Sequence, residues 1–466
     1  MIVETVERSW VTSGFFMGIV GKVGVIFPLN RRMASGVPGA SALQILAKWE
    51  ISYMLEFSDA PYRFFEARPS RPLIRLGREL NRHLILPGPN HRIEEIAISG
   101  ETDALHEAKR NGDRLLFVVN HPTHSDPQTL SEVHRRLGID SCFMAAYDVF
   151  LRSRFCAWSM QRLGNFSIDR EGSDRKAMAA AIDVLKEGKR ALNIFPEGNV
   201  YLTNDRVTPF LDGAAFIALK AQAALGDISV KIIPVSMKFT HLTAPRGGVT
   251  ERMMKLAADS GYLFPQGSAD DPVHAVLGLG QHILGGYLKR HGLAKGGGSL
   301  YELLEVFVED LVGGVEAGLE ISPAENSPLV SRIATIRSKI HRIRTDPEAT
   351  PHPEINGLAD RAILALRIHG YLTPYLTAHP TIDRYDETVE RIAEDFYSHA
   401  MPRTGPRRAM TKIHAPIDLR DFPEMKLREA LPTLTKTIQH TIQAGIDALN
   451  EANDAPGGAN ADPLIA

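Results

Sequence analysis

The chain has 466 residues, of which 44% are hydrophobic and 23% charged, so its composition is that of a globular protein with a large core. Lysine and arginine total 53 against 55 aspartates and glutamates, which argues against broad nucleic-acid binding because that relies on a strongly positive surface. Two cysteines, Cys142 and Cys156, are too few for a disulfide scaffold and indicate a reducing compartment.

Residues 1–88 are predicted to form a membrane-proximal helical segment. Residues 14–29 are mostly apolar but contain Lys22, and they fall short of the roughly 20 residues that a membrane-spanning helix needs. We interpret them as an interfacial or core segment. Residues 71–86 predict a helix with arginines on one face and leucines on the other. Such a helix suits an anionic lipid surface, although packing on the protein core would give the same pattern.

From residue 114 onward, strand and helix patterns alternate. Short apolar runs predict strands, and amphipathic stretches that end at glycines predict helices. Strands are expected at 114–120, 140–147, 165–170, 190–196 and 230–239, and helices at 127–137, 149–163, 174–187 and 212–225. Ser173 is the expected N-cap of the helix over 174–187, and Gly188 its end. This order predicts an α/β fold with a mostly parallel sheet flanked by helices.

The second half of the chain predicts a large all-helical insertion or C-terminal region at residues 249–408. A strand pattern returns at 410–419, followed by a helix at 434–449. We therefore expect a core of residues 89–248 plus 409–450, interrupted by the helical insertion. Residues 451–466 are small and polar and are expected to be disordered.

The stretch Asn120–Pro127, "NHPTHSDP", follows the strand expected at 114–120. Ligands bind at the carboxyl ends of parallel strands, so His121 would be exposed where a catalytic side chain belongs. Capping of the next helix, with Pro127 in its first turn, would alone explain Asp126, but it does not explain His121. A carboxylate bound to one imidazole nitrogen fixes the tautomer, and the other nitrogen can then take a proton from a hydroxyl.

Other chemistries at this turn are less well supported. His124 competes with His121 for the role of base, but it lies within the turn, further from the strand end. The spacing of His121, His124 and Asp126 fits a metal poorly, so no metal is expected. The sequence lacks a Gly-x-Ser-x-Gly elbow, which argues against a typical esterase. A His–Asp pair without a nucleophilic serine suits an activated acyl donor such as a thioester.

Two further strand ends carry polar residues. Arg170 could bind a phosphate or carboxylate, or it could simply pair with Asp169. Glu197 precedes Gly198, and its carboxylate could hold an acceptor hydroxyl, although a plain turn after a strand would look the same. Pro234 interrupts an apolar strand, and this predicts an edge strand or a bulge.

In this order, four segments resemble the four motifs of the glycerolipid acyltransferase family, the lysophosphatidic acid and glycerol-3-phosphate acyltransferases. They are "NHPTHSD", "GNFSIDR", "FPEGN" and "IIPVSM". "TPFLDGAAFIAL" is also similar to a family segment, and "IHAPIDL" near residue 413 resembles the last core strand. The resemblance implies an acyltransferase-like α/β core. It makes His121 the base, Asp126 its orienting partner, Arg170 a phosphate contact, and Glu197, Gly198 and Asn199 parts of the acceptor site.

The resemblance also implies a reaction and its partners. A fatty acyl group would move from acyl-CoA or acyl carrier protein, as co-substrate and without another cofactor, to a lysophospholipid hydroxyl in phospholipid biosynthesis. The default acceptor is 1-acylglycerol-3-phosphate, and the enzyme would lie peripherally on the cytoplasmic side of a membrane. The chain departs from the family where Asn199 and Val200 replace threonine and a polar residue, and where Asp212 replaces a basic residue. A catalytically silent membrane lipid-binding protein and a His–Asp lipid hydrolase remain as alternatives.

Overall fold

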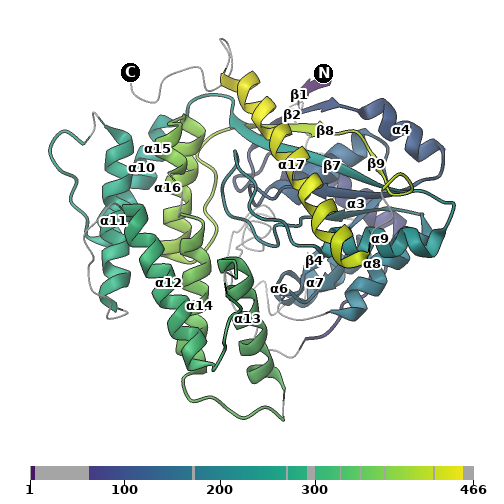
Figure 1. Cartoon of the computed structure of the whole chain (residues 1–466). Helices are drawn as coiled ribbons and strands as arrows, with labels where there is room; N and C mark the ends of the chain where they lie inside the picture. The colour runs from purple at the N-terminus through teal and green to yellow at the C-terminus, as the bar shows by residue number, and fades with distance from the viewer. Residues whose placement is uncertain are drawn as a thin grey trace, which may run out of the picture.

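The structure is a computed structural model that describes residues 2–5, 62–170, 174–268, 271–290, 300–325, 327–346, 348–371, 374–422 and 426–454. The apolar run at 14–29 and most of the expected tail lie outside the described residues. An α/β part and a helical part lie side by side (Figure 1).

The α/β part is built on one mostly parallel sheet, as predicted. Its strand order is β1-β2-β8-β7-β3-β6-β4-β5, and β9 pairs with β7. Strands β7, β3, β6, β4 and β5 run parallel, whereas β8 runs antiparallel to β7 and parallel to β2. The strands are β1 (Ile2–Thr5), β2 (Ile93–Gly100), β3 (Arg114–Val119), β4 (Ser141–Ala146), β5 (Phe166–Ile168), β6 (Ala191–Ile194), β7 (Val230–His241), β8 (Arg407–Ile413) and β9 (Ile417–Asp418).

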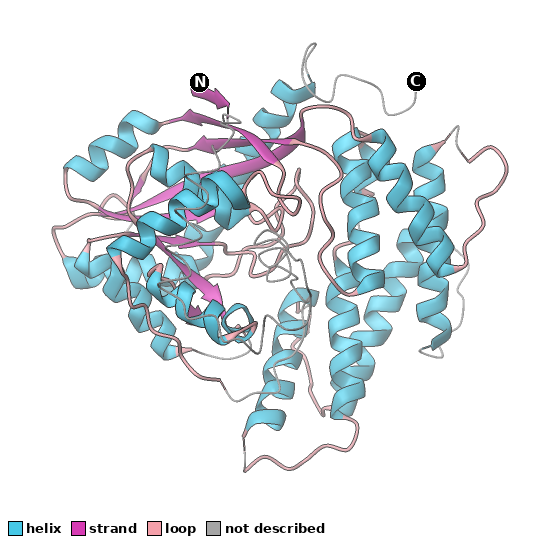
Figure 2. Cartoon of the chain, turned by 180° about the vertical axis from the view of Figure 1, so that it is seen from behind, coloured by secondary structure: helices cyan, strands magenta, loops and turns pink. Residues whose placement is uncertain are grey.

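Helices cover both faces of the sheet, which explains why the central strands are continuous apolar runs. One face packs against α4 (Thr102–Arg110) and α5 (Asp126–Arg136) in one apolar cluster. The other face packs against α8 (Arg175–Glu187), α9 (Gly213–Leu225) and α17 (Leu427–Asp454) in a second cluster. Figure 2 shows the sheet between these layers. Helix α17 continues to Asp454, so the expected disorder from residue 451 is wrong for the first four residues.

Two helix predictions are corrected by local capping. The single helix predicted at 149–163 is two helices, α6 (Tyr147–Leu151) and α7 (Arg154–Arg162). Ser153 separates them in an extended conformation, and its hydroxyl accepts the Cys156 N–H, which starts a new helix. The N-cap of α8 is Asp174, whose carboxylate accepts the Ala177 N–H at 2.9 Å, and not Ser173.

Pro234 lies in β7, which is a central strand and not an edge. Its carbonyl accepts the His414 N–H at 3.0 Å, at the break between β8 and β9. On that side β7 pairs with β8 only from Val235 onward and with β9 only up to Ile232. The missing proline N–H therefore falls where the ladder is already interrupted, and the irregularity lies in the partner strands.

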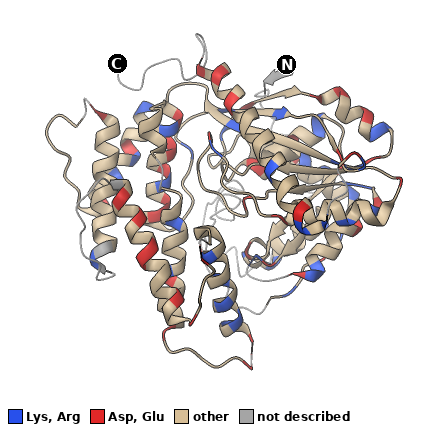
Figure 3. Ribbon diagram, viewed as in Figure 1, with Lys and Arg blue, Asp and Glu red and all other residues tan. Residues whose placement is uncertain are grey.

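The helical part lies between β7 and β8 in the sequence. Its helices are α10 (Arg246–Ser260), α11 (Pro272–Arg290), α12 (Leu300–Gly318), α13 (Leu329–Thr345), α14 (Ile355–His369), α15 (Tyr375–Ala378) and α16 (Ile382–Tyr397). They enclose two apolar clusters, one centred on α12–α14 and one on α10, α11 and α16. Basic and acidic residues are interspersed over both parts of the molecule (Figure 3).

The predicted basic helix at 71–86 is α3 (Arg71–Leu80), which continues as the π-helical turn η2 (Asn81–Ile85). Arg71 and Arg75 are exposed, and the leucines of the opposite face are half-buried. Arg78 donates to Asp140 at 2.8 Å, so part of the basic face binds the protein itself. Across the described ranges, no helix is both long enough and apolar enough to cross a bilayer.

Candidate active site

His121 and Asp126 meet in the turn between β3 and α5. The His121 Nδ1 atom lies 2.7 Å from Asp126 Oδ2. The His121 side chain is 17% exposed, whereas Asp126 is fully buried. Because Asp126 engages Nδ1, Nε2 is the nitrogen left for a substrate.

Asp126 does not cap α5 as predicted. Ser125 holds the N-cap position, and Asp126 is the first residue of the helix. The Asp126 carboxylate turns back toward the turn, where it accepts the Thr123 backbone N–H at 3.1 Å and the Thr123 hydroxyl at 2.8 Å. Thr123 and His121 supply the hydrogen-bond partners of the buried Asp126 carboxylate. The carboxylate therefore stabilises the turn and orients the imidazole.

The segment after β6 contacts His121 in two ways, by ring stacking and by a hydrogen bond. Phe195 stacks on the imidazole with ring centroids 4.3 Å apart. Glu197 accepts the His121 backbone N–H at 2.6 Å with one oxygen, and its other oxygen accepts the Thr208 N–H at 2.9 Å. Burial raises the pKa of the Glu197 carboxyl, and these hydrogen bonds oppose the rise. Both Glu197 oxygens therefore bind the protein, and the predicted contact of this carboxylate with an acceptor hydroxyl stays a prediction.

Asn120 fixes the end of β3 against β7. Its side-chain NH₂ donates to the Met237 carbonyl at 2.9 Å, and its side-chain oxygen accepts the Met237 N–H at 2.8 Å. The amide thus continues the β3–β7 ladder past the last strand residue. Asn204 makes the same kind of pair with Phe239, two residues further along β7.

Arg170 reaches the segment that follows β6. It donates to the Gly198 carbonyl and to the Asn199 side-chain oxygen, each at 2.8 Å. It also pairs with Asp148 at 2.9 Å, and not with Asp169. Gly198 has a φ of +73°, a conformation that glycine adopts without strain. Asn199 thus shares the guanidinium of Arg170, which the sequence alone did not predict.

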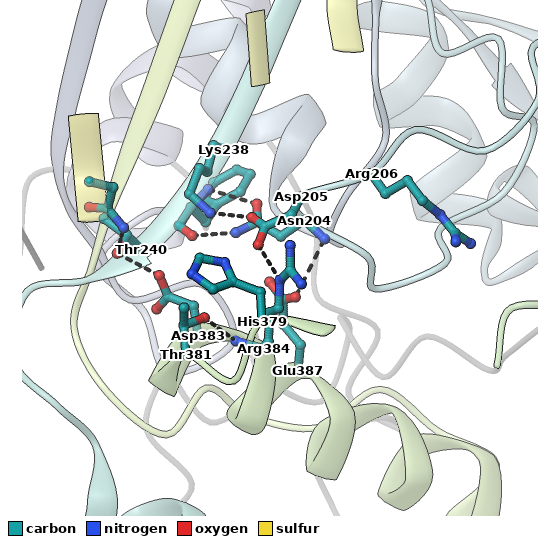
Figure 4. A network of polar contacts seen from close by, with 12 residues as sticks. Asn204, Asp205, Arg206, Lys238, Thr240, His379, Thr381, Asp383, Arg384 and Glu387 are labelled. Carbon is teal, nitrogen blue, oxygen red and sulfur yellow. Dashed lines mark hydrogen bonds and ion pairs between the residues drawn. The ribbon is translucent and has the colours of Figure 1, made fainter. Parts of the chain in front are cut away.

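All six predicted site residues belong to one connected set. Hydrogen bonds link His121 to Asp126 and to Glu197, and Gly198 and Asn199 follow Glu197 and bind Arg170. Two charged residues further along the chain lie outside this set. Asp212 accepts the Thr435 hydroxyl of α17 at 2.7 Å. The half-buried Arg206 points away from the neighbouring polar network (Figure 4).

Helix α16 contributes a residue to the turn, which the sequence reading missed. Glu394 lies 3.1 Å from Nε2 of His124. Burial raises the pKa of Glu394 and lowers the pKa of His124, so it favours the neutral form of both groups. The partners are 270 residues apart, and no local pattern connects them.

In the described part of the chain, no group of three or more His, Cys, Asp or Glu side chains is arranged to hold a metal ion. The resulting site is a His–Asp pair beside an aromatic wall and an arginine. A thioester carbonyl and an attacking hydroxyl are reactants that such a pair can serve.

Two comparisons with known proteins bear on this site. The model of the Acyltransferase family matches residues 101–238, which run from the start of α4 into β7. The chain is also similar to a 1-acyl-sn-glycerol-3-phosphate acyltransferase of Streptococcus pneumoniae (strain ATCC BAA-255 / R6), with 36% identity over 124 residues. This match covers 27% of the present chain and 41% of the relative, so the chain spans less than half the length of that relative.

Proposed function

We propose that the protein moves a fatty acyl group from a thioester to a lysophospholipid hydroxyl, because the Acyltransferase family model matches residues 101–238 and a 1-acyl-sn-glycerol-3-phosphate acyltransferase is similar over 124 residues. The observation that carries the proposal is the contact of 2.7 Å between His121 and Asp126, with the imidazole partly exposed. We propose acyl-CoA or acyl carrier protein as the donor and 1-acylglycerol-3-phosphate as the acceptor. Because the thioester is already activated, the reaction needs no further cofactor.

In the proposed mechanism, Nε2 of His121 takes the proton of the acceptor hydroxyl as the oxygen attacks the thioester carbonyl. Asp126 holds the Nδ1–H and stabilises the imidazolium that forms. Collapse of the tetrahedral intermediate breaks the carbon–sulfur bond, and the thiolate leaves with the proton from His121. Phe195 keeps the ring in place, and Glu197 fixes the backbone beneath it.

Arg170 is the proposed contact for the acceptor phosphate. Its guanidinium already binds Gly198 and Asn199, so a phosphate would join an arginine that these partners hold in place.

A purified-protein assay with acyl-CoA or acyl carrier protein and a panel of lysolipids tests the proposal. His121→Ala should lower kcat by at least about 100-fold, because general base catalysis contributes about that much or more. Asp126→Asn should also lower kcat. His440→Ala changes an exposed histidine of α17 and is the matched control. Full activity of His121→Ala would refute the mechanism, and fatty acid release without an acceptor would indicate a hydrolase.

We propose peripheral membrane binding on the cytoplasmic side through α3. The exposed Arg71 and Arg75 would contact anionic headgroups, beside half-buried leucines. Flotation with anionic liposomes should be lost at high salt and weakened in Arg71→Gln/Arg75→Gln. Equal flotation with neutral liposomes would contradict this proposal.

A further inference from the structure

A largely apolar cavity lies inside the helical part, between α11, α12, α14 and α16. Its volume is about 110 Å³, and it is partly open to solvent. Its walls include Val276, Ile283, Leu304, Leu364, Ile368 and Ile392. Proteins enclose small-molecule ligands in cavities that are lined mainly by apolar side chains. The cavity therefore has the lining of a ligand site.

Tyr371, Arg391 and Asp395 in the wall bind one another or backbone, and Nε of Arg367 lies 4.0 Å from Asp395. The Tyr371 hydroxyl donates to Asp395 at 2.6 Å. Arg391 donates to the Gly370 carbonyl at 2.8 Å, and its guanidinium lies 4.0 Å from the centre of the Tyr371 ring. Because these groups already have partners, a ligand inside the cavity meets mostly apolar surface. That environment suits a hydrocarbon chain and disfavours a charged one.

The cavity touches the candidate active site through the segment after Gly198. Leu202, three residues beyond Asn199, lines the cavity with a backbone φ of +51°. This conformation is strained for leucine and persists only where the surroundings hold it. The adjacent Tyr201 packs in the apolar cluster of α12–α14. The segment that carries Glu197 and Asn199 thus continues directly into the cavity wall.

A second connection runs through α16 to the turn that carries His121. Asp395 lines the cavity, and the preceding residue, Glu394, is hydrogen-bonded to His124. Helix α16 therefore contributes Asp395 to the cavity wall and Glu394 to the turn that carries His121.

We propose that this cavity binds a fatty acyl chain and places its reactive end toward His121. The inference rests on the proposed function, because an acyl-transfer reaction is what brings such a chain to this site. The shared chemistry is a saturated hydrocarbon tail, which could belong to the thioester donor or to the lysolipid acceptor. Each methylene buried there strengthens binding about fourfold, so the cavity would set a preference for chain length.

The first test makes the cavity shorter by enlarging one residue in its wall. Gly280 lines it from α11, and a Cβ there would meet Ile392 at an ordinary contact distance of 3.5 Å. Gly280→Leu also suits a helix interior better than glycine does, so the variant should fold. Gly286→Leu, on an exposed position of the same helix, is the matched control. Leu364→Phe fills the cavity from α14 as an independent second variant.

Activity is measured with donors of 8 to 18 carbons at a fixed acceptor, and with acceptors of varied chain at a fixed donor. Because the space is closely packed, Gly280→Leu should move the optimum to chains about two to four carbons shorter, in one of the two series. The series that shifts identifies the source of the chain. Profiles that stay the same in Gly280→Leu, Leu364→Phe and Gly286→Leu would overturn the proposal.

A binding experiment separates this inference from the proposed function. Palmitic acid with a terminal diazirine is photo-crosslinked to His121→Ala, and labelled peptides are mapped by mass spectrometry. Label on α11, α12 or α14 that Gly280→Leu reduces supports the cavity even if no acyl transfer is detected. Label confined to the α/β part would overturn the inference, and acyl transfer by the wild type would then still support the proposed function.

Discussion

At the scale of single residues, Glu197 illustrates how a buried carboxylate can shape a site without touching a reactant. Both of its oxygens accept hydrogen bonds from the protein, one from the backbone of His121 and one from Thr208. Its position therefore ties the strand end at β6 to the strand end at β3. In this interpretation Glu197 is a positioning residue for the imidazole.

Glu197→Gln replaces an acceptor oxygen by an NH₂ group, which then faces a backbone donor. One buried donor is left without a partner, which costs about 1–3 kcal/mol of stability. Because Glu197 holds the His121 backbone, the substitution should also displace His121. The value of kcat should then fall by up to about 100-fold, with a smaller change in KM. Thermal unfolding and steady-state kinetics measure the two effects. An unchanged kcat in a destabilised Glu197→Gln would show that the contact is structural only.

His241, at the end of β7, is a buried cation near pH 7. Burial alone would lower its pKa, but hydrogen bonds to Asp383 and Asp386 outweigh it, and the pKa rises to about 9. The Nδ1 atom lies 2.8 Å from Asp383, and Nε2 lies 3.2 Å from Asp386. An unfolded histidine has a pKa of about 6.5, so the folded state binds the proton more tightly.

His241→Gln should therefore destabilise the protein in a pH-dependent way. The advantage of the wild type is fully present below pH 6.5 and is lost as the pH rises through about 9. Its size is roughly 3 kcal/mol at low pH. Urea unfolding of both proteins from pH 5.5 to 9.5 measures the difference. A difference that is constant over this range would contradict the raised pKa.

At the scale of elements, α16 binds the α/β part through buried charges (Figure 4). Lys238 of β7 is fully buried and pairs with Asp205. Asp205 also accepts from Arg384 of α16 at 2.6 Å. Thr240, further along β7, donates to Asp383 of α16 at 2.6 Å. The charged face of α16 therefore contacts β7, a strand whose apolar sequence pattern alone would place it in the core.

The two partners in this ion pair should respond unequally to substitution. Asp205→Asn leaves Lys238 and Arg384 without their carboxylate and should cost about 3–5 kcal/mol, as for other broken buried pairs. Lys238→Met removes the buried ammonium while Asp205 keeps Arg384, so its cost should be clearly smaller. Urea denaturation of both variants gives the comparison. Equal losses of stability in the two variants would contradict the inference that Asp205 binds both Lys238 and Arg384.

At the scale of the whole molecule, the helical part is an insertion into a β-hairpin. His241 pairs with Arg407 in the antiparallel β7–β8 ladder, and Leu242 donates to the Pro406 carbonyl at 2.9 Å. The ends of the insertion are therefore adjacent. Figures 1 and 2 show it beside the α/β part, and α16 supplies several of the contacts between them.

Replacing residues 243–405 with an Asn-Gly turn would satisfy the hairpin geometry. The excised chain should nevertheless be poorly soluble or strongly destabilised, because Asp205 loses Arg384, and Thr240 and His241 lose Asp383. Soluble yield and thermal unfolding are the measurements. An excised chain as stable as the intact protein would contradict this account of α16.

The sequence by itself determined the alternating strands and helices, the parallel sheet, and the pairing of His121 with Asp126. These features depend on neighbours within a few residues: apolar runs, glycine stops, and a turn that brings positions 121 and 126 together. The carboxyl ends of parallel strands meet at one edge, so Arg170, Glu197 and Gly198 could be placed near them, and the family resemblance added Asn199. The local errors, at Ser153 and Asp174, arose where more than one residue could cap a helix.

Only the tertiary structure decided what these side chains bind. The sequence did not reveal that both oxygens of Glu197 are used by the backbone, or that Glu394 reaches His124 from 270 residues away. Nor did it reveal that Asp205 neutralises Lys238 and also binds Arg384 of α16, or that α11, α12, α14 and α16 leave a cavity between them. Such contacts join segments that are far apart along the chain. Their partners are chosen by packing and by the need to satisfy every buried charge, and neither leaves a local pattern.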